Sequence, residues 1–196
     1  MKIGVLGIQG AVSEHVEITW KAMEELKIKG EVLVVKRLEH LEGLDGLIIP
    51  GGESTTISSM LKRTGLFEEV RKKAIAGMGI MGTCAGAIML AKKVNEGNVE
   101  TLALMDIAVS RNAYGRQVDS FEADVEIAGF DRKFRAIFIR APIITEAWGD
   151  AKVLATDGKN IIMVEQGNHL ALTFHPELTG DTRIHGRFLN TLIKKS

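Results

Sequence analysis

Residues 79–86 read Gly-Ile-Met-Gly-Thr-Cys-Ala-Gly, a short apolar run that leads into a cysteine between two glycines. The run over 79–82 predicts a buried strand, and residues 85–92 predict a helix directly behind the cysteine. A strand that turns sharply into a helix is the unit from which parallel α/β sheets are built. Cys84 is therefore expected at the carboxyl edge of the sheet, where such folds bind ligands.

The same alternation extends from this turn back to the N-terminus. Strands are predicted at 2–8, 31–36 and 44–49. Helices are predicted between them at 12–26, 54–62 and 66–76. Short connections between these elements favour a mostly parallel central sheet flanked by helices, in a flavodoxin-like α/β fold.

The pattern changes after the helix that follows Cys84. Further strands are predicted, with few helices between them, at 99–109, 121–127, 134–139, 152–155, 161–166 and 170–174. A turn-like Gln-Gly-Asn separates the last two strands, and helical spacing returns over 180–195. We therefore expect a hairpin-rich antiparallel section in the second half, and one domain over residues 1–196.

Composition excludes several classes of protein. The chain has 25 basic and 25 acidic residues, which argues against a large nucleic-acid or anionic-membrane footprint. No apolar run approaches the roughly 18 residues of a membrane span, and no secretory signal pattern opens the chain. A single cysteine excludes an internal disulfide and fits a reducing compartment. We therefore expect a cytoplasmic protein that binds neither membrane nor nucleic acid.

The sequence around Cys84 has the form of a nucleophile elbow, glycine-x-nucleophile-x-glycine. Such a turn exposes the sulfur, and the N-terminus of the following helix favours thiolate over thiol. The backbone N–H of Ala85 is placed to stabilise an oxyanion. The pentapeptide alone leaves open a second interpretation, a small cysteine buried in a glycine-rich turn.

The last predicted strand runs into His175-Pro176-Glu177, which is a candidate base with its orienting carboxylate. Residues i and i+2 of an extended segment project to the same side, so the Glu177 carboxylate can lie beside the His175 imidazole. There it would hold the tautomer and stabilise the imidazolium. The alternative is a strand-end histidine followed by a helix-start glutamate. The occurrence of the elbow in the same chain favours a Cys84–His175–Glu177 triad.

A glycine-rich loop, Pro-Gly-Gly-Glu-Ser-Thr-Thr at 50–56, connects a predicted strand to a predicted helix. Phosphate binding is disfavoured because neither a P-loop lysine nor the pattern G-x-G-x-x-G is present. Glu53 of this loop could bind an ammonium group. Arg111 and Arg140 each follow an apolar strand, where an arginine suits a carboxylate. A purely structural turn and two solvated arginines are the alternatives.

The remaining histidines do not form a convincing metal site. They are His15, His40, His169 and His185. None of their spacings, taken with carboxylates or Cys84, matches a metal-ligand pattern. We expect neither a metal nor a cofactor.

These segments resemble the class I, or triad, glutamine amidotransferases, and in particular the glutaminase subunits of pyridoxal 5′-phosphate synthase. The elbow and His-Pro-Glu specify only the superfamily. The opening strand with Gln9-Gly10 and Glu14-His15, the Gly-Gly-Glu-Ser loop, and the segment Arg-Asn-Ala-Tyr-Gly-Arg-Gln at 111–117 specify the subunit. Further similar segments lie at 120–122, 139–142 and 175–179. Gly7 departs mildly from the family's first strand.

The resemblance implies that Cys84 is the nucleophile, His175 the base and Glu177 the orienter. The glutamine contacts that it implies are Gly52, Glu53, Ser54, Arg111, Ile139 and Arg140. The implied reaction is hydrolysis of L-glutamine to L-glutamate and ammonia. The implied partner is the synthase subunit, which uses ribose 5-phosphate and glyceraldehyde 3-phosphate and accepts the ammonia. A separate partner is also expected because the glutaminase motifs occupy the whole chain.

Coupling to that partner is expected to involve the Gly51–Gly52 peptide. Glycine tolerates both signs of φ, so this peptide could rotate and aim either a carbonyl or an N–H at the oxyanion. Gly52 would then join Ala85 as the second donor. Gln9 and Gly10, at the end of the first strand, are expected on the same edge and are candidates for the docking surface.

Two other functions remain as alternatives. A non-catalytic flavodoxin-like binding or regulatory module would be expected to have a broken triad. A Cys-elbow hydrolase that acts on another amide or a peptide would be expected to lack the pairing of Glu53 with Arg111.

Overall fold

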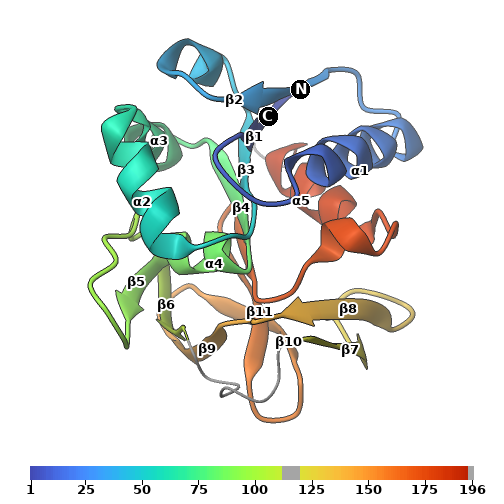
Figure 1. Ribbon diagram of the computed structural model, residues 1–196. Coiled ribbons are helices and arrows are strands. Elements are labelled where there is room, and N and C mark those ends of the chain that lie inside the picture. The colour runs from blue at the N-terminus through green and yellow to red at the C-terminus, as the bar shows by residue number, and fades with distance from the viewer. Residues whose placement is uncertain (112–119, 194–196) are drawn as a thin grey trace.

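A ten-stranded sheet runs through the molecule and carries helices on both faces (Figure 1). This computed structural model describes residues 1–111 and 120–193. Five neighbouring strands are parallel and form one half of the sheet, in the order β2, β1, β3, β4, β12. Their bounds are Glu31–Val35, Lys2–Leu6, Gly46–Ile49, Gly79–Thr83 and His169–Leu172.

The other half of the sheet is largely antiparallel. It continues from β12 through β11, β9, β6 and β5, which span Ile161–Gln166, Ile143–Ala147, Met105–Ser110 and Ala91–Val94. Only the last pair, β6 with β5, is parallel in this half. Strand β10, Lys152–Thr156, pairs with β11 outside this order. Strands β7, Ser120–Val125, and β8, Phe134–Ile139, form a separate antiparallel pair.

The helices divide between the two faces of the parallel half (Figure 1). Helices α1, Val12–Glu25, and α5, Arg183–Ile193, pack on one face. Helices α2, Ser54–Arg63, and α3, Leu66–Ile75, pack on the other. The short α4, Ala85–Leu90, follows β4, and two 3₁₀ turns span Leu38–Leu41 and Pro176–Leu178. Because both faces are covered, the central strands β3 and β4 are buried throughout.

The structure confirms the expected fold class, a mostly parallel α/β sheet with an antiparallel second half. Three local predictions were wrong. The helix expected over 85–92 ends at Leu90, because Ala91–Val94 pairs with β6 as β5. The strand expected over 99–109 begins only at Met105, since Leu102 and Leu104 donate their N–H groups to the end of α4. Strand β9 was not predicted at all.

Apolar residues recur at helical spacing in the first helix, at Val12, Val16, Trp20, Met23 and Leu26, and the stripe that they predict is only partly correct. Helix α1 buries His15, Ile18, Thr19, Ala22 and Met23, whereas Trp20 is 39% exposed. The buried stripe of this helix therefore contains a histidine and a threonine, two polar residues that apolar periodicity passes over.

The β7–β8 pair is held to the main sheet by aromatic packing. Phe138 of β8 is fully buried, stacks on Phe121 at 4.5 Å between ring centroids, and meets Phe174 edge-on at 5.7 Å. Phe174 lies directly before His175, so these contacts also fix the start of the segment that carries the predicted base.

We expect Phe138→Ala to lower the free energy of unfolding by about 3–5 kcal/mol, because it empties a close-packed aromatic site. Denaturant unfolding of both proteins measures the difference. Ile75→Ala is the matched control, since Ile75 is 74% exposed and its loss should change stability by less than about 0.5 kcal/mol. Equal effects of the two substitutions would contradict the assignment of Phe138 to the core.

Candidate active site

Cys84 lies in a strained turn between β4 and α4, as the elbow motif predicts. Its backbone has φ 51° and ψ −111°, a conformation with positive φ that residues other than glycine rarely adopt. A Cβ at Gly82 would lie 2.3 Å from the Gly86 oxygen, and one at Gly86 would lie 2.0 Å from the Ile49 oxygen. Both glycines of the motif are therefore required by close backbone approach.

His175 reaches the same edge from the neighbouring strand. Strand β12 pairs in parallel with β4, and the Cys84 N–H donates to the Leu172 oxygen at 2.8 Å. His175 lies three residues after the end of β12, and its N–H donates to the Ile137 oxygen at 2.8 Å. The His175 Nδ1 lies 2.8 Å from Oε1 of Glu177, whose side chain is fully buried. The three residues predicted to form the triad are thus neighbours in space.

The protonation of His175 is set by its two partners. Burial alone lowers the pKa of His175, but hydrogen bonds and charge from Cys84 and Glu177 outweigh burial and raise this pKa to about 10. The imidazole at this site therefore holds its proton at neutral pH. An imidazolium between a carboxylate and a sulfur favours the thiolate form of the sulfur.

The glycine loop lies directly against this pair. A Cβ at Gly51 would lie 2.6 Å from His175 Cε1 and 3.2 Å from Cys84 Cβ. On the other side, a Cβ at Gly10 would lie 2.1 Å from the Gly51 oxygen. The Glu53 N–H donates to Oε1 of Gln9 at 2.9 Å. The segment that follows β1 therefore contacts the loop, and the loop contacts the predicted nucleophile and base.

Glu53 and Arg111, which are 58 residues apart, form an ion pair with 2.7 Å between Arg111 Nη2 and Glu53 Oε1. The other carboxylate oxygen of Glu53 caps α2 by accepting from the Thr56 N–H at 2.8 Å. Burial raises the pKa of Glu53, but hydrogen bonds from Thr55 and Thr56 dominate and lower it to about 2. The Arg111 N–H is anchored by Glu96, at 2.7 Å from Oε2. The site therefore contains a positive and a negative group side by side.

The other residues expected to contact glutamine differ in their surroundings. Ile139 brings its carbonyl oxygen to 3.8 Å from Cys84 Sγ, and Arg140 is exposed with φ 44°. Ser54 is only 2% exposed, and its Oγ has no hydrogen-bond partner among the described residues. Its hydroxyl thus faces the protein rather than solvent. Residues 112–117 of the family-like segment lie outside the described residues.

Sequence reasoning set aside two histidines that the structure brings to the site. His15 Nε2 lies 3.3 Å from Glu177 Oε2, and His15 Nδ1 lies 3.0 Å from His185 Nε2. Both side chains are fully buried. Two features could have identified His15 as a residue of the site. They are its position on the buried stripe of α1 and its place in the Glu14-His15 pair that resembles the family.

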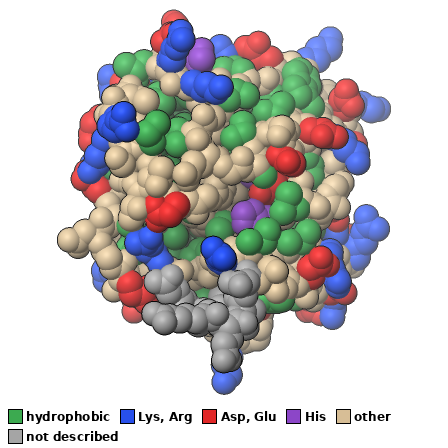
Figure 2. Space-filling model, viewed as in Figure 1, with side chains coloured by type: hydrophobic (Ala, Val, Ile, Leu, Met, Phe, Trp, Pro, Cys, Tyr) green, Lys and Arg blue, Asp and Glu red, His purple; other side chains and the backbone are tan. Residues whose placement is uncertain are grey.

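Hydrophobic side chains remain exposed beside the predicted triad. Ile139 is 39% exposed and Leu178, which follows Glu177, is 41% exposed. Figure 2 shows a face of the molecule on which a histidine lies near the centre with hydrophobic side chains beside it. Apolar groups around a reactive centre are suited to be covered by another surface.

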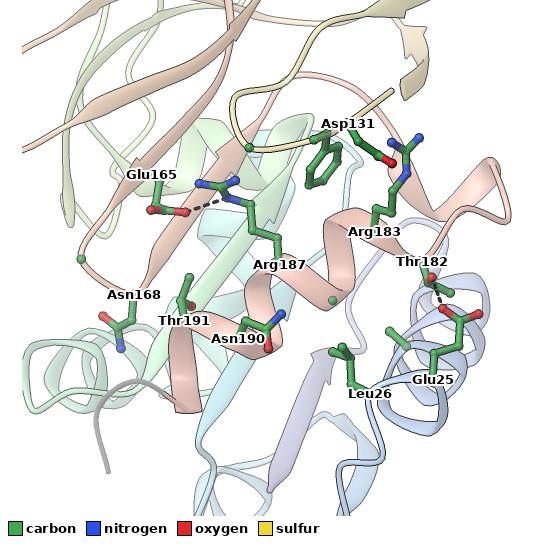
Figure 3. A pocket seen from close by; sticks show the side chains of 15 residues that line it. Glu25, Leu26, Asp131, Glu165, Asn168, Thr182, Arg183, Arg187, Asn190 and Thr191 are labelled. Atoms are coloured by element: carbon green, nitrogen blue, oxygen red, sulfur yellow. Dashed lines mark hydrogen bonds and ion pairs between the residues drawn. The ribbon is translucent and has the colours of Figure 1, made fainter. Parts of the chain in front are cut away.

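A separate hollow of about 760 Å³ is lined by α1, α5 and the turn that follows β11 (Figure 3). Its lining includes none of the predicted triad residues. Figure 3 shows Arg187 directed at Glu165, with 2.8 Å between Nε and Oε2. Arg183, on the same helix, pairs with Asp181 at 2.7 Å. Both arginines of the hollow therefore have a carboxylate partner.

Residues 1–111 and 120–193 lack two further features. No group of three or more His, Cys, Asp or Glu side chains is arranged there to hold a metal ion. In the same ranges, every helix is too short or too polar to cross a membrane.

Comparison with known proteins identifies the family. The model of the SNO glutamine amidotransferase family matches residues 5–194. The chain is 55% identical to the pyridoxal 5′-phosphate synthase subunit PdxT of Pyrococcus furiosus, over 98% of this chain and 100% of that protein. It is 51% identical to the PdxT of Staphylothermus marinus, over the full length of both.

Solved structures agree with this assignment. A crystal structure of a glutamine amidotransferase is 44% identical, covers 97% of this chain and 98% of its own, and superposes with a TM-score of 0.87. A glutamine amidotransferase from Thermotoga maritima, 17% identical over 100% of this chain and 97% of its own, shares the fold with a TM-score of 0.62. On the family match and the identity to PdxT proteins, this chain belongs to the SNO glutamine amidotransferase family.

Proposed function

We propose that this protein hydrolyses L-glutamine to L-glutamate and ammonia with Cys84 as nucleophile, His175 as base and Glu177 as orienter. The observation that carries the proposal is the contact of His175 with both Cys84 and Glu177 at the end of two paired parallel strands. Membership of a glutamine amidotransferase family supports the choice of substrate. The presence of all three side chains of the proposed triad supports catalysis over a non-catalytic module, and the Glu53–Arg111 pair supports an amino-acid substrate over another amide or a peptide.

The raised pKa of His175 supports a thiolate mechanism. His175 holds a proton beside the sulfur of Cys84, which attacks the side-chain amide carbon. His175 gives that proton to the departing nitrogen, the C–N bond breaks, and ammonia leaves a γ-glutamyl thioester. His175 then takes a proton from water, the hydroxide displaces the sulfur, and glutamate is released.

Two backbone N–H groups are proposed to stabilise the oxyanion of both tetrahedral intermediates. One is that of Ala85, the first residue of α4, where helix N–H groups have no partner within the helix. The other comes from Gly52 after rotation of the Gly51–Gly52 peptide. Gly52 has φ 148°, and neither glycine presents a side chain that would block rotation. One such donor contributes about 2.7–4 kcal/mol to transition-state stability.

Glutamine is proposed to bind at Gly52, Glu53, Ser54, Arg111, Ile139 and Arg140. The Glu53–Arg111 ion pair supports this because a zwitterion presents one group of each sign. The α-ammonium group would face Glu53 and the α-carboxylate would face Arg111. The Ile139 carbonyl, 3.8 Å from Cys84 Sγ, lies where it can accept a hydrogen bond from the substrate amide.

The ammonia is proposed to pass to a synthase subunit that makes pyridoxal 5′-phosphate. The relatives at 51% and 55% identity are named as subunits of that synthase, which supports the partner. The exposed Ile139 and Leu178 support a docked surface over the site. We further propose that residues 1–196 act as one glutaminase domain in the cytoplasm, where the single thiol stays reduced.

Docking is proposed to control the oxyanion site through Gln9 and Gly10. Gly10 abuts the Gly51 oxygen, and Gln9 accepts from the Glu53 N–H. A partner that displaces the segment between β1 and α1 therefore acts on the peptide that must rotate. Because these contacts are direct, no other helix or strand is needed to transmit the effect of the partner to the Gly51–Gly52 peptide.

The central experiment replaces Cys84. We expect Cys84→Ser and Cys84→Ala to abolish glutamate release, because the nucleophile is lost, while circular dichroism stays unchanged. Mass spectrometry after reaction with a glutamine-analogue electrophile should show one adduct in the wild type, which contains one cysteine, and none in the variants. Near wild-type turnover in Cys84→Ala would refute the mechanism.

A second experiment separates the base from its orienter. We expect His175→Asn to lower kcat about 10²–10⁴-fold and Glu177→Gln to lower it less, because only His175 transfers protons. The charge of Glu177 helps to raise the pKa of His175 to about 10. Removal of that charge should therefore move the pKa downward, which NMR titration of the His175 ring measures. An unchanged titration in Glu177→Gln would show that Glu177 does not tune the base.

A third experiment tests control by the partner. We expect slow glutamate release from the isolated protein and a large increase when the synthase subunit is added, since one oxyanion donor is worth roughly 100- to 1000-fold in rate. Gln9→Ala should reduce the increase while the isolated protein still reacts with the electrophile at Cys84. Full activity without the partner would refute the switch and leave the triad untouched.

A further inference from the structure

His15 and His185 form a buried chain of contacts behind Glu177. The three side chains come from α1, α5 and the 3₁₀ turn Pro176–Leu178, and each is fully buried. His15 Nε2 lies 3.3 Å from Glu177 Oε2 and 3.2 Å from Thr83 Oγ1. His15 Nδ1 lies 3.0 Å from His185 Nε2. One imidazole ring on α1 thus contacts three other elements of the fold, the 3₁₀ turn, β4 and α5.

The second carboxylate oxygen of Glu177, Oε2, is a buried hydrogen-bond acceptor, and the potential donor beside it among the described residues is His15 Nε2. The Oε1 of Glu177 is bonded to His175, whereas its buried Oε2 makes no hydrogen bond among the described residues and has His15 Nε2 at 3.3 Å. A buried carboxylate oxygen without a donor costs more free energy than a neutral acceptor would. The His15 Nε2 that faces this oxygen at 3.3 Å also lies 3.2 Å from the Thr83 hydroxyl.

The direction of the chain follows from the chemistry of its members. A carboxylate only accepts hydrogen bonds, so the proton of neutral His15 lies on Nε2. The His15 Nδ1 must then accept, and His185 donates to it from its own Nε2. The His185 Nδ1 is left as a bare lone pair, in accord with its having no hydrogen-bond partner in the described part of the chain.

Burial keeps both rings neutral, as this direction requires. Burial lowers the pKa of His15 well below its ordinary value, with further lowering by the charges of His185 and His175. Burial lowers the pKa of His185 to about 3. A second positive charge therefore does not form beside His175.

We propose that His15 is a positioning residue for the reaction: its Nε2–H holds Glu177 Oε2, with His185 fixing the His15 tautomer, so that Oε1 stays directed at His175. The inference rests on the proposed glutaminase function. His15 acts through Glu177 and does not touch the reacting atoms. Its contact with Thr83, which precedes Cys84, also holds the nucleophile turn and the orienter in one arrangement.

Three variants measured with the synthase subunit present test the proposal. His15→Leu removes the donor and should lower kcat about 10- to 100-fold, the effect of one hydrogen bond to a charged group, with KM for glutamine within about twofold. His15→Gln places an amide N–H near the position of Nε2 and should restore kcat to within about fivefold of wild type. Thr19→Val, equally buried on α1, is the matched control and should leave kcat unchanged.

The tautomers of the wild-type protein give an independent readout. Nitrogen-15 NMR of the histidine rings should show His15 and His185 neutral, with hydrogen on Nε2, between about pH 5 and 9. His15 with its hydrogen on Nδ1 would overturn the proposal, even if His15→Leu failed to fold. Wild-type kcat in a folded His15→Leu, or equal losses in the Leu and Gln variants, would also overturn it. If the wild type released no glutamate, the proposed function would fail. The tautomers of His15 and His185 would still test the proposed contacts from His185 through His15 to Glu177.

Discussion

The parallel pairing of β4 with β12 is the constraint on which the site depends. Thr83 lies opposite Leu172 across this pair, although 89 residues separate them in the chain. Parallel strands end at the same edge, so Cys84 and His175 emerge beside each other. The antiparallel section between the two strands can vary in length and shape, because the pairing alone sets the distance between the proposed nucleophile and the proposed base.

Much of this arrangement could be predicted from the sequence, because it is encoded locally. The two glycines around Cys84 are needed because the backbone approaches closely at both positions. Pro176 favours the turn that brings Glu177 beside His175. The parallel half of the sheet follows from alternating strand and helix patterns. Each of these signals lies within a few residues, where periodicity and turn chemistry can be read.

What could not be predicted depends on contacts between distant segments. Strand β9 contains Thr145 and Glu146 and follows Pro142, so its pattern is not that of a core strand; pairing with β6 makes it one. His15 and His185 lie 170 residues apart, and nothing in either helix alone indicates that their rings meet. A histidine breaks the apolar spacing from which a buried stripe is predicted, but in α1 the histidine is itself a buried residue of that stripe.

The left-handed backbone at Cys84 means that this chain is not built for maximal stability. A side chain at φ 51° is held there by the surrounding strand and helix at a cost of about 1–3 kcal/mol, and glycine would occupy the position without that cost. Selection for a more robust fold would therefore favour loss of the sulfur. A relative with glycine at this position would be more stable than its ancestor, but it would lack the thiol that the proposed reaction requires.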